Sequence, residues 1–203
     1  YNRVESDAFA NYYKLNLSGD IDSSQVISSR YPDGGSNFLS AALFHSLERN
    51  TLKGNTLHLG YRLSYQGLKS VYEIDFFNLP YKSIQSNNLA LTGAMGYKLK
   101  QGRIIEHSFT ASSGFHAPNV DDMSKVFEKA GELTVPNNEL KPEYLISGEY
   151  SFYLAGWKDK LYIKANLYYS HLFSTIVKLP FTLNGQDSLV YDGELLPVFA
   201  NTN

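Results

Sequence analysis

Hydrophobic and polar residues alternate along much of this chain with a period of two. The pattern is clearest in Leu57–Tyr65, Tyr144–Leu154 and Leu161–Ser170, where most alternate residues are apolar or aromatic. Such alternation places one set of side chains on each face of a β-strand. Three further segments show a weaker version, because small residues dilute the contrast: Phe38–Glu48, Leu89–Leu99 and Ile104–Phe115. The pattern therefore predicts an all-β fold.

The connections between these strands alternate between short and long. The short ones contain glycine and predict tight hairpin turns: Asn50–Asn55, Lys100–Arg103 and Ala155–Asp159. The long ones are Glu5–Ser36, Gln66–Asn87, His116–Lys141 and Phe173–Asp187. Strands joined in this way form an antiparallel up-and-down meander, as in transmembrane β-barrels with short periplasmic turns and long extracellular loops. One helical turn is predicted within a loop, in Val120–Ala130, with Asn119 or Asp121 as its cap.

Composition narrows the class of protein further. The 203 residues are 43% hydrophobic and 14% aromatic, which is enough for a sizeable core. A net charge of -2 gives no basic footprint, so we expect no nucleic-acid partner. The absence of cysteine excludes a disulfide scaffold and a thiolate metal site. No stretch approaches the ~20 apolar residues of a spanning helix. The protein is therefore either soluble or crosses a membrane as strands.

Two short motifs frame the loop that follows Phe115. The first reads Phe-His-Ala-Pro and the second Pro-Asn-Asn-Glu-Leu-Lys-Pro-Glu. They resemble the paired signature boxes of TonB-dependent outer-membrane receptors, with His116 where that family usually has arginine. Arg30–Ser36 and Phe181–Leu195 look like loops from the Bacteroidetes branch of the family. The matching box positions are Phe115, Ala117, Pro118, Pro136, Asn137, Asn138, Leu140, Lys141, Pro142 and Glu143.

The resemblance implies a larger fold than this chain can build. Such receptors have about 22 barrel strands and an amino-terminal plug that carries the TonB box, whereas this length supplies only about seven to nine strands. We therefore expect residues 1–203 to be a partial arc of the barrel domain, without plug or TonB box. A stand-alone barrel of about eight strands is the alternative. The arc is favoured because Tyr1–Val4 and Val198–Ala200 both resemble strands in progress.

The resemblance also implies a location and an activity. The protein would lie in the bacterial outer membrane, in contact with its lipid, and would bind a scarce nutrient at the cell surface. The expected ligand is a small molecule such as an iron-siderophore or haem, imported with energy from TonB, which acts through the plug. Two other classes fit the strand pattern: a passive outer-membrane pore or structural barrel, and a soluble β-sandwich binding module. An enzyme is not expected, because the chain lacks the common catalytic motifs.

The loop between the two boxes holds the candidate ligand-binding residues. Loops on a rigid scaffold often carry binding groups. Prolines and asparagines in the boxes suit the base of a fixed loop. Haem receptors of the resembled family carry a histidine between the boxes, and Ala117–Leu140 contains none. We therefore expect no metal and no cofactor, with His116 as an alternative iron ligand. The candidates are His116, Asp121, Asp122, Lys125, Phe127 and Glu128.

Overall fold

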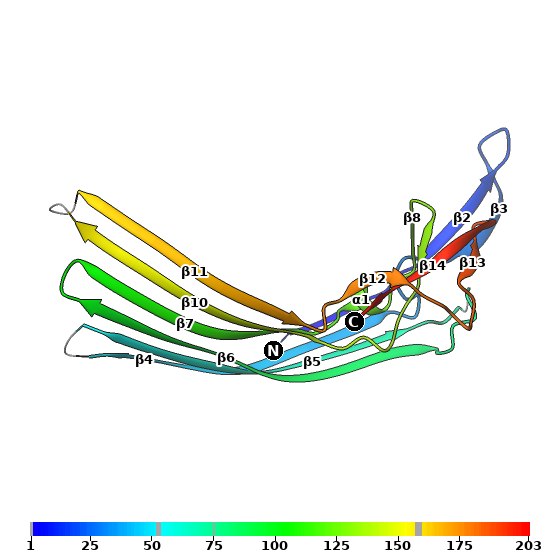
Figure 1. Ribbon diagram of the computed structural model, residues 1–203. Coiled ribbons are helices and arrows are strands. Elements are labelled where there is room, and N and C mark those ends of the chain that lie inside the picture. Colours follow the sequence, from blue (N-terminus) through cyan, green and yellow to red (C-terminus); the bar gives the residue numbers. More distant parts are fainter. Residues whose placement is uncertain (1, 52–53, 75, 157–159) are drawn as a thin grey trace.

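A long, curved antiparallel sheet dominates the structure (Figure 1). The structure is a computed structural model and describes residues 2–51, 54–74, 76–156 and 160–203. Within these residues the sheet has seven strands in the order β1-β4-β5-β6-β7-β10-β11. In the same residues no helix is long and apolar enough to cross a membrane. The strands are β1 (Asn2–Ser6), β4 (Ser36–Asn50), β5 (Thr56–Val71), β6 (Ser83–Gln101), β7 (Ile105–His116), β10 (Glu143–Gly156) and β11 (Leu161–Phe173).

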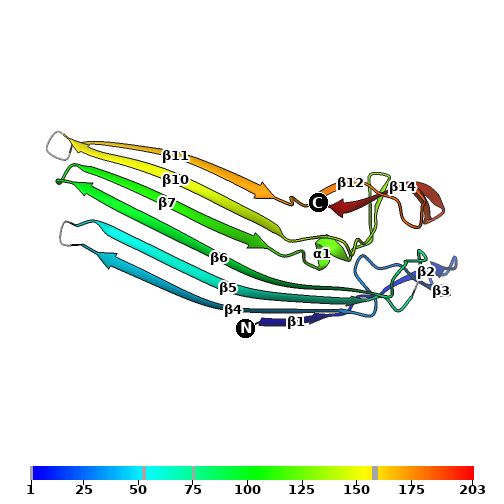
Figure 2. The ribbon, with the colours of Figure 1, turned by 60° about the horizontal axis from the view of Figure 1, so that its bottom comes forward.

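The long strands follow one another in chain order, each antiparallel to the next. This confirms the all-β fold and the antiparallel meander, and the sheet is consistent with part of a barrel. Figure 2 shows the hairpin turns at one end and the long connections at the other, here called the short-turn end and the loop end. The turn after β6 reverses at Gly102, whose φ of 69° lies in the left-handed region. The other two predicted turns lie partly outside the described residues.

One face of the sheet is apolar across all the long strands. The register aligns Leu59, Met95, Ala111, Gly148 and Tyr169 in one row across β5, β6, β7, β10 and β11. We call this side the apolar face and the opposite side the inner face. Large residues of the apolar face are widely exposed in the chain by itself: Leu43 is 70% exposed, Leu91 69% and Leu167 72%. A continuous apolar surface of this kind indicates a contact with another apolar medium.

Both strands next to the second loop are longer than the alternation predicts. The expected connection Gln66–Asn87 shrinks, because β5 continues to Val71 and β6 begins at Ser83. The two faces exchange polarity in this stretch. Lys69 is an exposed, charged residue on the side of the apolar row. Leu68, an apolar residue on the inner face, is only 3% exposed. The reversal hid these strand ends from the sequence pattern, because loops cover the inner face here.

The long connections form secondary structure of their own. After β1 the chain makes a separate two-stranded sheet that projects at the loop end (Figure 1). Other connections form a second sheet in the order β12-β14-β9-β8, with β13 beside β14. The strands are β2 (Ala10–Leu15), β3 (Ile21–Ile27), β8 (Phe127–Lys129), β9 (Glu132–Thr134), β12 (Val177–Pro180), β13 (Ser188–Tyr191) and β14 (Glu194–Thr202).

Two details at the loop end differ from the predictions. The helix α1 spans only Val120–Met123, and β8 occupies Phe127–Lys129 of the expected helical turn. Asn119 is its cap, and its side chain accepts hydrogen bonds from two backbone N–H groups. The strand at Val198–Ala200 is present but belongs to β14, which pairs in parallel with β9 in the second sheet. It does not join the long sheet, because its apolar side chains pack into a loop-end core with Leu133.

We predict that the apolar face tolerates no charge at mid-sheet. Leu91→Lys should lower the free energy of unfolding from lipid vesicles by about 2–4 kcal/mol. Thr92→Lys places the same charge on the inner face and should lower the free energy of unfolding much less. Urea unfolding followed by circular dichroism measures both. Equal effects of the two variants would contradict a lipid-facing surface, because a lysine at an exposed, water-facing site is nearly neutral.

Candidate functional site

The loop between the two boxes folds onto the inner face at the loop end. A chain of buried hydroxyl groups joins it to the sheet: Ser124 Oγ donates to Ser70 Oγ at 3.1 Å, and Ser36 Oγ lies 3.0 Å from Ser70 Oγ. Ser70 and Ser124 are fully buried. Met123 of the loop and Leu140 of the second box share an apolar cluster with sheet residues. The loop is therefore held by packing and by satisfied hydroxyl groups.

The ends of the two boxes meet across neighbouring strands. His116 ends β7 and faces Glu143, the first residue of β10. His116 Nδ1 lies 2.9 Å from Glu143 Oε2, and His116 Nε2 lies 4.0 Å from Asp122 Oδ2. The other oxygen of Glu143 accepts the Ile176 N–H at 2.8 Å. His116, the candidate iron ligand, thus lies between two carboxylates at the base of the loop.

The second box is fixed mainly through Asn137, which is 6% exposed. Its backbone N–H donates to the Met123 carbonyl at 2.9 Å. Its side chain donates to the Asn201 carbonyl at 2.8 Å and accepts the Glu139 N–H at 2.9 Å. Tyr81 OH donates to the Pro136 carbonyl at 2.8 Å. The neighbouring Asn138, by contrast, is exposed.

Other box residues contribute apolar contacts or backbone bonds. Ala117 and Pro118 are buried, and the Phe115 ring lies 5.4 Å from that of Tyr144 across the β7–β10 pair. Lys141 takes part through its backbone, because Asn203 accepts its N–H at 3.1 Å and donates to its carbonyl at 2.7 Å. Pro142, beside it, is half-buried. All of these contacts stabilise the fold of the boxes.

Two asparagines missed by the sequence reasoning hold the boxes in place. Asn201 donates to the Asp122 carbonyl at 2.9 Å, and Asn203 donates to the carbonyls of Lys141 and Ser174. Asn201 lies in β14 and Asn203 directly follows its end, so the two stand two residues apart in the sequence. That spacing is the one signal in the sequence. This spacing can be interpreted only in the tertiary structure, where the end of β14 lies beside the two boxes.

Asp121 is the centre of an ionic cluster between the first loop and α1. Arg30 Nη2 and Tyr31 OH lie 2.9 and 3.0 Å from its Oδ1, and Lys125 Nζ lies 2.9 Å from its Oδ2. Partial burial acts to raise the Asp121 pKa, but hydrogen bonds from Lys125, Arg30 and Tyr31 outweigh it and lower the pKa to about 2. Asp121 therefore stays ionised and joins two loops.

The remaining candidates lie next to this cluster. The Arg30 guanidinium stands 4.3 Å from the centre of the Phe127 ring, a cation–π contact. Glu128 is exposed, and its carboxylate accepts the Gly131 N–H at 3.0 Å. The structure thus brings the six sequence candidates to one place around α1 and β8. In the described residues no group of three or more His, Asp or Glu side chains is placed to hold a metal.

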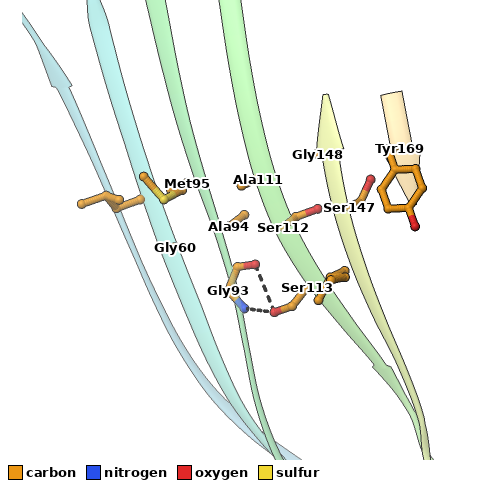
Figure 3. Close-up of a pocket in the computed structure, with 12 residues that line it drawn as sticks. Gly60, Gly93, Ala94, Met95, Ala111, Ser112, Ser113, Ser147, Gly148 and Tyr169 are labelled. Atoms are coloured by element: carbon orange, nitrogen blue, oxygen red, sulfur yellow. Dashed lines mark hydrogen bonds between the residues drawn. The ribbon is translucent and has the colours of Figure 1, made fainter. Parts of the chain in front are cut away.

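A shallow hollow of about 630 Å³ lies away from this loop, across the middle of the sheet (Figure 3). Most of its lining residues belong to the apolar face, with Leu59, Met95 and Tyr169 beside small residues. Gly93 N–H donates to Ser113 Oγ at 2.9 Å, the contact drawn in Figure 3. The bond satisfies a backbone group just beyond the last β6–β7 pair, Ala94↔Ser112. The hollow is a part of the apolar face.

Comparison with known proteins identifies the fold. No family model matches the chain, and no curated protein matches its sequence. Among solved structures, the whole chain superposes on a double mutant of the Serratia marcescens hemophore receptor HasR, in complex with its hemophore HasA and heme. The TM-score is 0.65 and the identity 15%, and the chain spans 36% of the length of that receptor chain. The chain therefore has a β fold like that of part of this hemophore receptor.

We predict that the two asparagines of the second box differ sharply in importance. Asn137→Ala removes the side chain's two hydrogen bonds in a buried site and should lower the free energy of unfolding by about 1–3 kcal/mol. Asn138→Ala changes an exposed residue and should cost about 0.5 kcal/mol or less. Urea unfolding compares them, and limited proteolysis reports whether residues 117–142 become accessible. Similar losses for both variants would contradict the structural role of Asn137.

Acid should loosen the contact between the first loop and α1. Because the folded-state pKa of Asp121 is lowered from 3.8 to about 2, its ionised form stabilises the fold above about pH 4. This contribution is lost as pH falls towards 2 and, for a half-exposed cluster, amounts to at most about 1 kcal/mol. Urea midpoints between pH 5 and 2 should fall less steeply for Asp121→Asn than for the exposed control Asp187→Asn. If the urea midpoints of the two variants fall equally with pH, the ionised Asp121 does not stabilise the fold in this way.

Proposed function

We propose that this chain is a segment of the barrel domain of an outer-membrane active-transport receptor. In this proposal the receptor binds a scarce nutrient at the cell surface and imports it with TonB-supplied energy. The plug and the TonB box would belong to other parts of a longer protein. The 36% span of the matched receptor chain supports this division.

The observation that carries the proposal is the arrangement of the loops relative to the two faces. An exposed apolar face suits lipid, and the box loop packs against the opposite face at the loop end only. A passive pore needs no such structured loop. A soluble β-sandwich would bury the apolar face against a second sheet. The second sheet here instead packs around its own core with Leu133 and Val198.

The site supports a small nutrient as the ligand, bound where loops meet above the inner face. The base of the loop is saturated by internal bonds, so recognition falls to the exposed Glu128 and the half-buried Phe127 beside it. The matched receptor was solved with heme and a hemophore. In this chain His116 is the one histidine at the boxes, and it already contacts Glu143. We therefore propose an iron-siderophore or similar molecule ahead of haem.

Growth on defined nutrients tests the proposal. A strain without the gene should fail on one source among ferric siderophores, haem and oligosaccharides, and the intact gene should restore growth. Restoration should require TonB, because the import is active. If growth is restored equally without TonB, the passive-pore alternative holds. If the purified protein is monomeric in water without detergent, the membrane assignment is wrong.

A further inference from the structure

A cluster of cationic side chains lies on the inner face at the short-turn end. The register places Lys100 opposite Glu106, Glu106 opposite Tyr153, and Tyr153 opposite Lys164, so one row crosses β6, β7, β10 and β11. Directly opposed residues of neighbouring strands share a face. Arg103 lies in the turn beyond this row. The row lies at the opposite end of the sheet from the box loop (Figure 2).

The cluster borders a polar hollow of about 460 Å³. Lys100, Arg103, Glu106 and Tyr153 all line it. Lys98 Nζ stands 3.1 Å from Glu106 Oε1 and neutralises the carboxylate. Within the described part of the chain, no ion pair involves Lys100, Arg103 or Lys164. Lys100 and Arg103 therefore line the hollow, and Lys164 stands at the end of the adjoining row, without an ion-pair partner among the described residues.

An aromatic pair adjoins the charges. The rings of Tyr153 and Tyr162 stack at 6.0 Å, with 22° between their planes. Tyr162 occupies the same parity of β11 as Lys164, so both belong to the inner face. The site thus combines separated cations with a flat aromatic surface. Carboxylates on an extended backbone fit this combination, because charged side chains can reach the cations while the chain packs on the rings.

We propose that this inner-face cluster binds an acidic polypeptide segment. The proposal rests on the proposed function, since the membrane-facing apolar side defines which face is inner. Lipid headgroups beside the apolar face lie on the other side of the sheet, which favours a peptide over an anionic lipid. Complementary charge steers such binding and makes it sensitive to salt.

Fluorescence anisotropy with a labelled deca-glutamate peptide tests the site on the full-length protein in an uncharged detergent. The variant carries Lys100→Gln, Arg103→Gln and Lys164→Gln. At low salt it should bind the peptide at least about tenfold more weakly than the parent protein. A matched control removes the same charge elsewhere and should stay within about twofold. Its changes are Lys14→Gln, Lys69→Gln and Lys129→Gln, and circular dichroism checks that both variants fold.

Three results would overturn the proposal. In the first, the parent protein does not bind the peptide. In the second, both variants lose peptide binding equally. In the third, the Lys100, Arg103 and Lys164 substitutions weaken binding to phosphatidylglycerol vesicles but leave peptide binding unchanged. The measurement involves no uptake. If the protein binds the peptide at this cluster but restores no growth, only the proposed function is contradicted. If it restores growth but does not bind the peptide, only the peptide-binding proposal is contradicted.

Discussion

The opposed character of the two sheet faces is the constraint on which the rest of the structure depends. Antiparallel pairing aligns apolar side chains in rows across β5, β6, β7, β10 and β11, and nothing in the described chain covers them. Such a surface is stable only against an apolar medium. The inner face is then left for polar groups and loops. The folded loop and the charged row at the short-turn end lie on that side.

At the loop end the faces exchange roles, and this exchange fixes the site. Leu68 and Ile84 turn inward and are buried beneath Met123, while Lys69 faces out. The loop between the boxes therefore has an apolar floor, and hydroxyl and amide bonds hold its edges. Those bonds are neutral and resist changes of salt. The Asp121 cluster is ionic and lies at the surface, and its contribution is lost only when the pH falls towards the lowered pKa of Asp121, about 2.

Much of the sheet was predictable, because alternation depends on local sequence. The meander followed from spacing, and residue type gave Asn119 and Asp121 as the two candidate caps, of which the structure shows Asn119. The extensions of β5 and β6 did not, since their alternation reverses where loops supply the burial. The helical turn was overestimated after Met123, where pairing of β8 with β9 outweighs local helix preference. The six candidate residues are close together in the sequence, so their proximity in the fold needs no tertiary contact, but nothing local reveals that Asp121 is paired with Arg30 from a distant loop.

The sequence by itself determined the strand class, the chain-order meander and the position of the boxes, because period-two patterns and turn residues act over a few neighbours. Only the tertiary structure decided where Val198–Ala200 pairs and that Asn201 and Asn203 hold the boxes. It also decided that Lys100 and Arg103 line one hollow and that Lys164 lies in the same cross-strand row as Lys100. These are contacts between segments far apart in the chain. Their partners are set by register and burial, which no local pattern of residues encodes.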